Sequence, residues 1–203
     1  MGTRAAGIPG SFLFTVTETG YMRIIGGSLG GRRVNPPANM PHTRPTTDIA
    51  KEGLFNILQN NLELEGIKTL DLFGGTGSIS YELASRGAAD LTIVEKDDKM
   101  HAFISNNTQA LHIENCRVIK TDVFKFINLC TEQFDFIFAG PPYALAGIDK
   151  LPRLVAEKKL LKPGGWFVLE HTPRNNYEKF ELYKTSRNYG TTIFSIFIEP
   201  AAG

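Results

Sequence analysis

From residue 67 onward, short apolar runs alternate with segments in which apolar residues recur every three or four positions. The short runs are typical of buried strands, and they predict strands at 67–72, 91–94, 117–120, 134–139 and 166–170. The segments between them predict helices at 78–85, 98–110, 123–129 and 149–161. Strands that alternate with helices in this way predict an α/β fold with a doubly wound parallel sheet.

The pattern changes at the carboxyl end of the chain. Residues 162–165 read Lys-Pro-Gly-Gly and predict a turn before the last parallel strand. Residues 179–186 and 191–198 then flank the turn-forming segment 187–190 and predict a hairpin. Such a hairpin places an antiparallel strand at or near one edge of the sheet.

The amino-terminal part predicts a small extension in front of this domain. Residues 22–34 predict a hairpin, 35–45 an extended loop interrupted by prolines, and 46–60 a helix capped by Thr46 or Thr47. Residues 1–21 are interrupted by glycines and a proline, so we expect a disordered upstream extension or cloning remnant. The chain therefore divides into three parts, at 1–21, 22–62 and 63–200.

Composition places the chain among ordinary globular domains. Its 203 residues are 42% hydrophobic and 21% charged, and no apolar run approaches the roughly 20 residues that cross a bilayer. The two cysteines form neither a disulfide framework nor a metal-ligand set, so a cytoplasmic protein without a metal or membrane is expected. A monomer is the default expectation.

The net charge of +1 gives no argument for nucleic-acid binding by itself, but the distribution of the basic residues along the chain does. Basic residues gather between positions 22 and 51, where Asp48 is the single acidic residue: Arg23, Arg32, Arg33, Arg44 and Lys51. This segment is either a phosphate-contacting surface or a solvated hairpin that happens to be basic.

A glycine-rich segment, 71–78, sits where the first parallel strand turns into the first helix. In an open α/β sheet, this crevice at the strand carboxyl ends is the usual ligand site. The segment lacks the Lys-Ser/Thr of a phosphate-binding loop, and Ser80 replaces the third glycine of a dinucleotide fingerprint. Asp71 would repel a pyrophosphate but would pair with the ammonium of a methionine moiety. S-adenosylmethionine carries that ammonium and no phosphate.

Two further carboxylates follow the next two strands. Glu95 ends the second strand, where it can accept hydrogen bonds from both ribose hydroxyls of a nucleoside. Asp122 follows the third strand, where it is either an acceptor for the adenine amino group or the N-cap of the following helix. The candidate cofactor contacts are Asp71, Phe73, Gly75, Thr76, Gly77, Glu95, Lys96, Asp122 and Val123.

The fourth strand leads into Gly140-Pro141-Pro142-Tyr143, the candidate catalytic residues. This segment is similar to the (Asp/Asn)-Pro-Pro-(Tyr/Phe) signature of enzymes that methylate an exocyclic amino group on a nucleobase. There the acidic or amide side chain accepts an N–H of the target amine, the prolines fix the backbone, and the aromatic ring stacks on the extruded base. Gly140 supplies no such acceptor, a loss that typically costs about 10²–10³ in rate.

From Met22 onward, the chain resembles the bacterial methyltransferases that modify N2 of a guanine in 16S ribosomal RNA, the RsmD-like family. The matching segments are 22–27, 31–33, 44–48, 51–56, 71–77, 85–88 and 162–165. The resemblance implies a seven-stranded, Rossmann-like class I fold that uses S-adenosylmethionine and releases S-adenosylhomocysteine. It implies the small ribosomal subunit as partner, and a hairpin and Arg-Pro-Thr loop that close over cofactor and RNA through Arg23, Arg32, Arg33, Arg44 and Thr46. The departure is Gly140, which puts full activity in doubt.

Three other readings stay open at the level of sequence. A DNA amino-methyltransferase shares the fourth-strand motif, although 203 residues leave no separate target-recognition domain. A cofactor-binding assembly factor that has lost activity is supported only by Gly140. A dinucleotide oxidoreductase is disfavoured by Asp71 and by the imperfect fingerprint.

Overall fold

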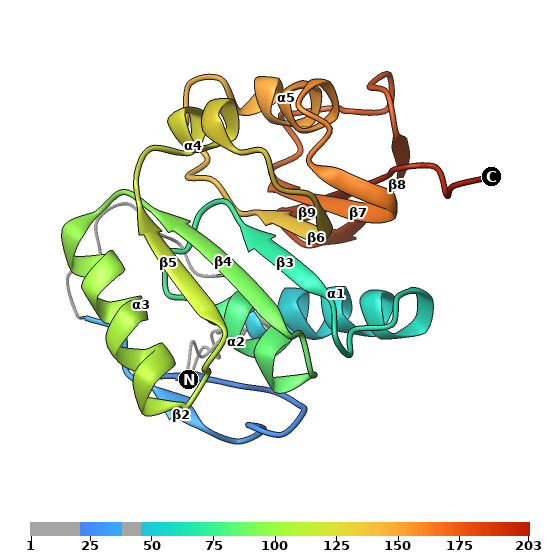
Figure 1. The fold of residues 1–203 in the computed structure, drawn as a ribbon. Coiled ribbons are helices and arrows are strands. Elements are labelled where there is room, and N and C mark those ends of the chain that lie inside the picture. Colours follow the sequence, from blue (N-terminus) through green and yellow to red (C-terminus); the bar gives the residue numbers. More distant parts are fainter. Residues whose placement is uncertain (1–20, 38–45) are drawn as a thin grey trace, which may run out of the picture.

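The computed structural model describes residues 21–37 and 46–203, and its centre is a seven-stranded sheet (Figure 1). The strand order is β5-β4-β3-β6-β7-β9-β8, with β3 to β7 parallel and β9 antiparallel to both of its neighbours. The order reverses between β3 and β6, so a crevice opens there at the strand carboxyl ends. The strands are β3 (Lys68–Asp71), β4 (Asp90–Glu95), β5 (Cys116–Lys120), β6 (Phe134–Ala139), β7 (Leu161–His171), β8 (Tyr183–Tyr189) and β9 (Thr192–Ile198).

Helices cover both faces of the sheet. One face carries α1, α2 and α3, and the other carries α4 and α5 (Figure 1). Apolar side chains of α1 and α2 form one core with the sheet, and those of α4 and α5 form a second core on the opposite face. The helices are α1 (Asp48–Asn61), α2 (Ser78–Ser85), α3 (Asp98–Ala110), α4 (Val123–Leu129) and α5 (Leu151–Glu157), with a 3₁₀ turn at Ile148–Lys150. None of the helices in this described part is long and apolar enough to cross a membrane.

A short amino-terminal hairpin of β1 (Met22–Arg23) and β2 (Arg33–Val34) docks on α1 and α2 through buried polar contacts. Lys51 of α1 is 1% exposed and lies 3.2 Å from the Glu82 carboxylate of α2, which is fully buried. The Lys51 ammonium also donates to the Arg23 carbonyl at 2.7 Å. This pairing corrects the prediction that Lys51 belongs to an exposed basic surface: its charge is used inside the fold.

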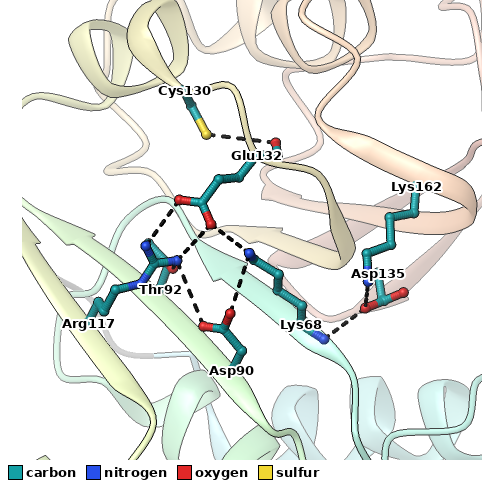
Figure 2. Close-up of polar contacts among 8 residues, drawn as sticks. All are labelled: Lys68, Asp90, Thr92, Arg117, Cys130, Glu132, Asp135 and Lys162. Atoms are coloured by element: carbon teal, nitrogen blue, oxygen red, sulfur yellow. Dashed lines mark hydrogen bonds and ion pairs between the residues drawn. The ribbon is translucent and has the colours of Figure 1, made fainter.

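An ion-pair network joins the amino ends of the parallel strands (Figure 2). Glu132 binds Arg117 through both oxygens, at 3.1 and 3.0 Å, and accepts from Lys68 at 2.6 Å. Asp90 pairs with the same two cations, while Asp135 binds Lys162 and the backbone N–H of Lys68. The hydrogen bonds from Arg117 and then Lys68 hold the pKa of Glu132 at about 2. Carboxylates paired with lysine and arginine therefore link the amino ends of neighbouring strands.

Three elements have boundaries that differ from the sequence prediction, all in the carboxyl-terminal half. Helix α5 ends at Glu157 and not at 161, because Lys159 turns into the left-handed region and sends Leu160 and Leu161 into the core. The predicted turn at 162–165 lies inside β7, where Gly164 and Gly165 hydrogen-bond the segment after β9.

The closing hairpin is correct in kind but shifted along the chain. Strand β8 begins at Tyr183 and runs to Tyr189, so the predicted turn residues 187–189 pair with β9. The turn is formed at Gly190, whose φ of +70° favours glycine. The other predicted elements appear within two residues of their expected bounds. The expectations for residues 1–20, for 38–45 and hence for Arg44 lie outside the described residues.

Candidate active site

The glycine-rich segment forms a tight loop between β3 and α2. Gly75 and Gly77 have φ angles of +52° and +77°, and a Cβ at Gly77 would collide with the Tyr81 ring. The N–H of Gly74 donates to the Val94 carbonyl at 2.9 Å, which ties the loop to β4. Thr76 bonds the Met22 sulfur at 3.3 Å, so the amino-terminal hairpin touches the loop directly.

Asp71 lies at the carboxyl end of β3 and is 3% exposed. One carboxylate oxygen accepts from the N–H of Phe73 at 3.2 Å, and the other accepts from the Ser80 hydroxyl at 3.0 Å. Burial raises the pKa of Asp71 to about 7, although both hydrogen bonds act in the opposite direction. A cation placed beside this carboxyl group would restore its charge.

Glu95 ends β4 and reaches across the loop. Its Oε2 accepts from the Gly75 N–H at 2.9 Å, and its Oε1 accepts from the Asp97 N–H at 2.8 Å. A carboxylate has about four acceptor positions, so two backbone bonds fix the group and leave acceptor capacity for a ligand.

Asp122 is the N-cap of α4, one of the two roles that the sequence left open. Its Oδ1 accepts from the N–H groups of Phe124 and Lys125, at 2.9 and 3.3 Å. Within the described part of the chain, its Oδ2 has no hydrogen bond. The cap therefore leaves one oxygen for an adenine amino group, and the two roles are compatible.

Two adjoining cavities run along the carboxyl edge of the sheet. The first, of about 230 Å³, lies between the start of α2 and the fourth-strand motif; it is lined by Thr46, Asp71, Phe73, Gly74, Gly75, Thr76, Ser78, Ile79, Phe138, Gly140, Pro141, Pro142 and Tyr143. The second, of about 250 Å³, is lined by Leu72, Phe73, Gly75, Val94, Glu95, Lys96, Asp97, Met100, Thr121, Asp122, Val123, Gly140, Pro142 and Leu145. Gly140 and Pro142 line both, so the motif lies where the cavities meet.

This arrangement fits S-adenosylmethionine by its chemistry. The second cavity has apolar walls with Glu95 and Asp122 at its rim, a combination suited to an adenosine. Asp71, in the first cavity, offers a buried carboxyl group for an ammonium. Among the described residues, no group of three or more His, Cys, Asp or Glu side chains could hold a metal ion.

The motif itself follows β6 without a break. Pro142 accepts from the Leu145 N–H at 2.8 Å, whereas no described backbone N–H is bonded to the carbonyls of Gly140 and Pro141. Tyr143 is 40% exposed beside the first cavity, and its hydroxyl donates to Glu170 at 3.2 Å. The motif thus brings an aromatic ring to the first cavity and leaves the carbonyls of Gly140 and Pro141 without a described backbone donor.

The backbone conformation at position 140 does not require glycine, because the φ of Gly140 lies outside the left-handed region. A Cβ at this position would lie 3.0 Å from the Phe138 ring and 3.7 Å from Glu170 Oε2. A Cβ at this position therefore requires a small shift of the Phe138 ring, and it would face the Glu170 carboxyl group.

The candidate RNA-contacting residues are scattered over the amino-terminal hairpin. Arg32 and Arg33 are exposed, and Arg33 lies over the Tyr21 ring at 4.4 Å. Arg23 pairs with Asp48 at 3.4 Å, with both side chains about half exposed. Thr46 lies apart from the hairpin: it lines the first cavity and donates to Glu170 at 2.6 Å.

Two residues that hydrogen-bond the lining of the first cavity have no site role in the sequence interpretation. Ser80 was noted only as a missing glycine, yet it is the hydroxyl partner of Asp71. Glu170 was assigned to a strand and given no role. The signal was available: Glu170 is a carboxylate near the carboxyl end of the next parallel strand, the same feature that singled out Asp71 and Glu95.

Sequence comparison finds relatives over most of the chain. Residues 22–198 match the model of the family described as Conserved hypothetical protein 95. The protein named Ribosomal RNA small subunit methyltransferase D of Haemophilus influenzae is 32% identical over 160 residues, which are 77% of this chain and 81% of that protein.

Solved structures share the fold. A putative methyltransferase from Escherichia coli, yhhF, superposes with a TM-score of 0.78 at 25% identity, over 90% of this chain and all of that one. A 16S rRNA guanine-N2 methyltransferase from T. thermophilus, solved with AdoMet and guanosine, has a TM-score of 0.65 at 23% identity, over 88% of this chain and 49% of that one. At that identity the second likeness concerns the fold alone, which is the predicted class I methyltransferase fold.

Proposed function

The chain belongs to the family described as Conserved hypothetical protein 95, and from that premise we propose that it methylates the exocyclic N2 of a guanine in 16S ribosomal RNA, with S-adenosylmethionine as methyl donor. The observation that carries this proposal is the meeting of the two cavities at residues 140–143. The second cavity has the carboxylates suited to an adenosine, and the first has both the carboxyl group suited to an ammonium and the motif suited to a nucleobase amine.

We assign the cofactor side to the loop and the three strand-end carboxylates. Glu95 would hold the ribose hydroxyls, the free oxygen of Asp122 the adenine amino group, and Asp71 the ammonium. Phe73, Gly75, Lys96 and Val123 form the walls between these groups. When bound, S-adenosylmethionine supplies a methyl group on a positively charged sulfur and leaves as S-adenosylhomocysteine.

The lone pair of the exocyclic nitrogen is delocalised into the base. The substrate side of the site therefore has to orient that nitrogen so that its lone pair can attack the methyl group. Carbonyls of Gly140 and Pro141 can accept an N–H of that amine, and the two prolines hold them in place. Tyr143 offers its ring for stacking on an extruded base. Once methylated, the nitrogen is acidic and loses its proton to water, so the site needs no strong base.

The remaining assignments concern the partner. Arg32 and Arg33 on the hairpin would contact RNA phosphates, and we assign the same role to Arg23 and Arg44 of the same basic segment. A net charge of +1 suits a monomer that docks on the assembled small subunit and does not wrap free RNA. A second candidate, a cofactor-binding assembly factor without activity, is favoured by one observation, the missing side chain at Gly140.

The test is methyl transfer from labelled S-adenosylmethionine to small ribosomal subunits that lack the modification. The unaltered chain and Gly140→Asp are compared, with Gly140→Asn as a neutral variant that avoids a second carboxylate near Glu170. Transfer by the unaltered chain is expected, with a gain of up to about 10²–10³ when the acceptor is restored. Cofactor binding without transfer by any of the three would overturn the proposed substrate and favour the assembly-factor reading.

A further inference from the structure

Glu170 lies directly beside the position where the motif lacks its side chain. In the register of β6 with β7, Ala139 pairs with Leu169, so Gly140 and Glu170 are the next neighbours across the sheet. A Cβ built on Gly140 would be 3.7 Å from Glu170 Oε2. The carboxyl group of Glu170 therefore occupies the space toward which a side chain at position 140 would extend.

The contacts of Glu170 place it immediately behind the wall of the first cavity. Glu170 is 4% exposed, and it accepts from the hydroxyls of Thr46 at 2.6 Å and Tyr143 at 3.2 Å. Both of these residues line the first cavity. The Tyr143 bond is longer than is usual for an O–H···O hydrogen bond, and its side chain is 40% exposed. Of the two hydroxyls, that of Tyr143 is the one a bound base can replace most easily.

The chemistry of guanine fits a carboxylate at this place. The Watson–Crick edge of guanine carries two adjacent donors, N1–H and the N2 amino group, and a carboxylate is an acceptor with two oxygens. Adenine and cytosine place a ring-nitrogen acceptor on the same edge, which a carboxylate would repel. An acceptor beside Gly140 thus serves both to hold the amine and to select guanine.

We propose that Glu170 binds the N1–H and N2–H donors of the target guanine and supplies the acceptor that Gly140 lacks. This inference rests on the proposed function, since it names a specificity residue for the same substrate. In this role Tyr143 turns from Glu170 to stack on the base, while Thr46 keeps its hydrogen bond and holds the carboxylate in position.

The first test is a binding preference, which a merely structural role of Glu170 would not move. Guanosine and the fluorescent 2-aminopurine riboside share the 2-amino group, but 2-aminopurine has an acceptor at N1 in place of the donor. With S-adenosylhomocysteine present, the unaltered chain should prefer guanosine by at least about fivefold, the lower end for a good bidentate contact. Glu170→Gln can donate to that N1 and should reduce or reverse the preference.

The matched control is Glu178→Gln, the same chemical change at an exposed carboxylate, which should keep the preference of the unaltered chain. Affinity for S-adenosylhomocysteine verifies that each variant is folded. An unchanged preference in Glu170→Gln overturns the inference, and so does a failure of the unaltered chain to bind guanosine.

The second test is methyl transfer to small subunits. Glu170→Gln should lower the rate by about 10- to 100-fold in the unaltered chain, and adding Gly140→Asp should restore most of it, because the two positions share one task. Activity that appears with Gly140→Asp but is absent from the unaltered chain would overturn the role of Glu170 while leaving the proposed function intact. Absence of transfer from both would overturn the proposed function itself.

Discussion

Carboxylates lie at both the amino ends and the carboxyl ends of the parallel strands, here called the amino edge and the carboxyl edge of the sheet. The two edges differ in the groups that bind these carboxylates. At the amino edge, Asp90, Glu132 and Asp135 are each paired with lysine or arginine (Figure 2). At the carboxyl edge, Asp71, Glu95 and Asp122 accept from backbone N–H groups and a serine hydroxyl, and no described cation pairs with them. The first arrangement is complete in itself, whereas the second keeps negative groups oriented beside two cavities.

The pKa shifts follow the same division. Arg117 and Lys68 hold the pKa of Glu132 at about 2, while burial raises the pKa of Asp71 to about 7. Carboxylates paired with cations link neighbouring strands, whereas the carboxylates at the carboxyl ends of the strands have no described cation beside them. Strand-end carboxylates without such a cation therefore mark the functional end of the sheet.

The largest effect is expected from Asp71→Asn, through pH. Because the folded pKa is raised from 3.8 to about 7, the stability that Asp71 contributes is present below about pH 4 and lost as pH rises to about 7. At about 1.4 kcal/mol per pKa unit, the loss reaches up to about 4 kcal/mol. Urea unfolding at pH 5 and pH 8 should show the asparagine variant gaining relative to the unaltered chain. Equal differences at both pH values would contradict the shift.

The same carboxyl group predicts how cofactor binding responds to pH. An ammonium beside Asp71 favours the charged form, so affinity for S-adenosylmethionine should rise as pH increases through about 7. Titration calorimetry at several pH values measures this, and Asp71→Asn should flatten the curve. A pH-independent affinity in the unaltered chain would remove Asp71 from the ammonium site.

Glu95→Ala should weaken S-adenosylmethionine binding by about 1–3 kcal/mol, the usual cost of leaving bonded groups unpaired. The control lies at the opposite edge: Glu132→Ala removes a carboxylate of the same type from an ion-pair network and should leave cofactor affinity unchanged. Equal losses in the two variants would mean that the two edges do not differ in function.

Glu132→Gln should lower stability by no more than about 1 kcal/mol, because its side chain is 39% exposed and exposed ion pairs are screened. The lowered pKa means that its contribution is present above about pH 4.5 and lost as pH falls toward about 2. High salt should reduce the effect further. A loss of several kcal/mol would show that the amino edge is more than a set of solvated pairs.

The smallest effect on the protein itself is expected from reversing Arg32 and Arg33 to glutamate. Both side chains are exposed, so stability and cofactor affinity should stay the same. Binding to the small subunit should fall and become less sensitive to salt, with the logarithmic salt slope reduced by about one per lost phosphate contact. Unchanged subunit binding would disprove the basic hairpin as an RNA contact.

The fold and the carboxylates that line the two cavities could be predicted from the sequence because they depend on local signals. Strand and helix periods set the sheet, and carboxylates at strand ends identified Asp71, Glu95 and Asp122. The errors arose where distant segments decide the outcome. The Lys-Pro-Gly-Gly segment entered β7 because the chain after β9 supplies its partners, and Lys51 is buried because Glu82 lies opposite. The position of Glu170 beside Gly140, Thr46 and Tyr143 likewise depends on segments that are far apart in the sequence.

The identity of the methylated product distinguishes a guanine-N2 methyltransferase from every other reading of this site. Small subunits lacking the modification are incubated with the protein and labelled S-adenosylmethionine, and their 16S rRNA is digested to nucleosides and separated by mass. We expect the label in N2-methylguanosine, in larger amount with Gly140→Asp and in much smaller amount with Glu95→Ala. Label in a methylated adenosine or cytidine, or in no nucleoside at all, would contradict it.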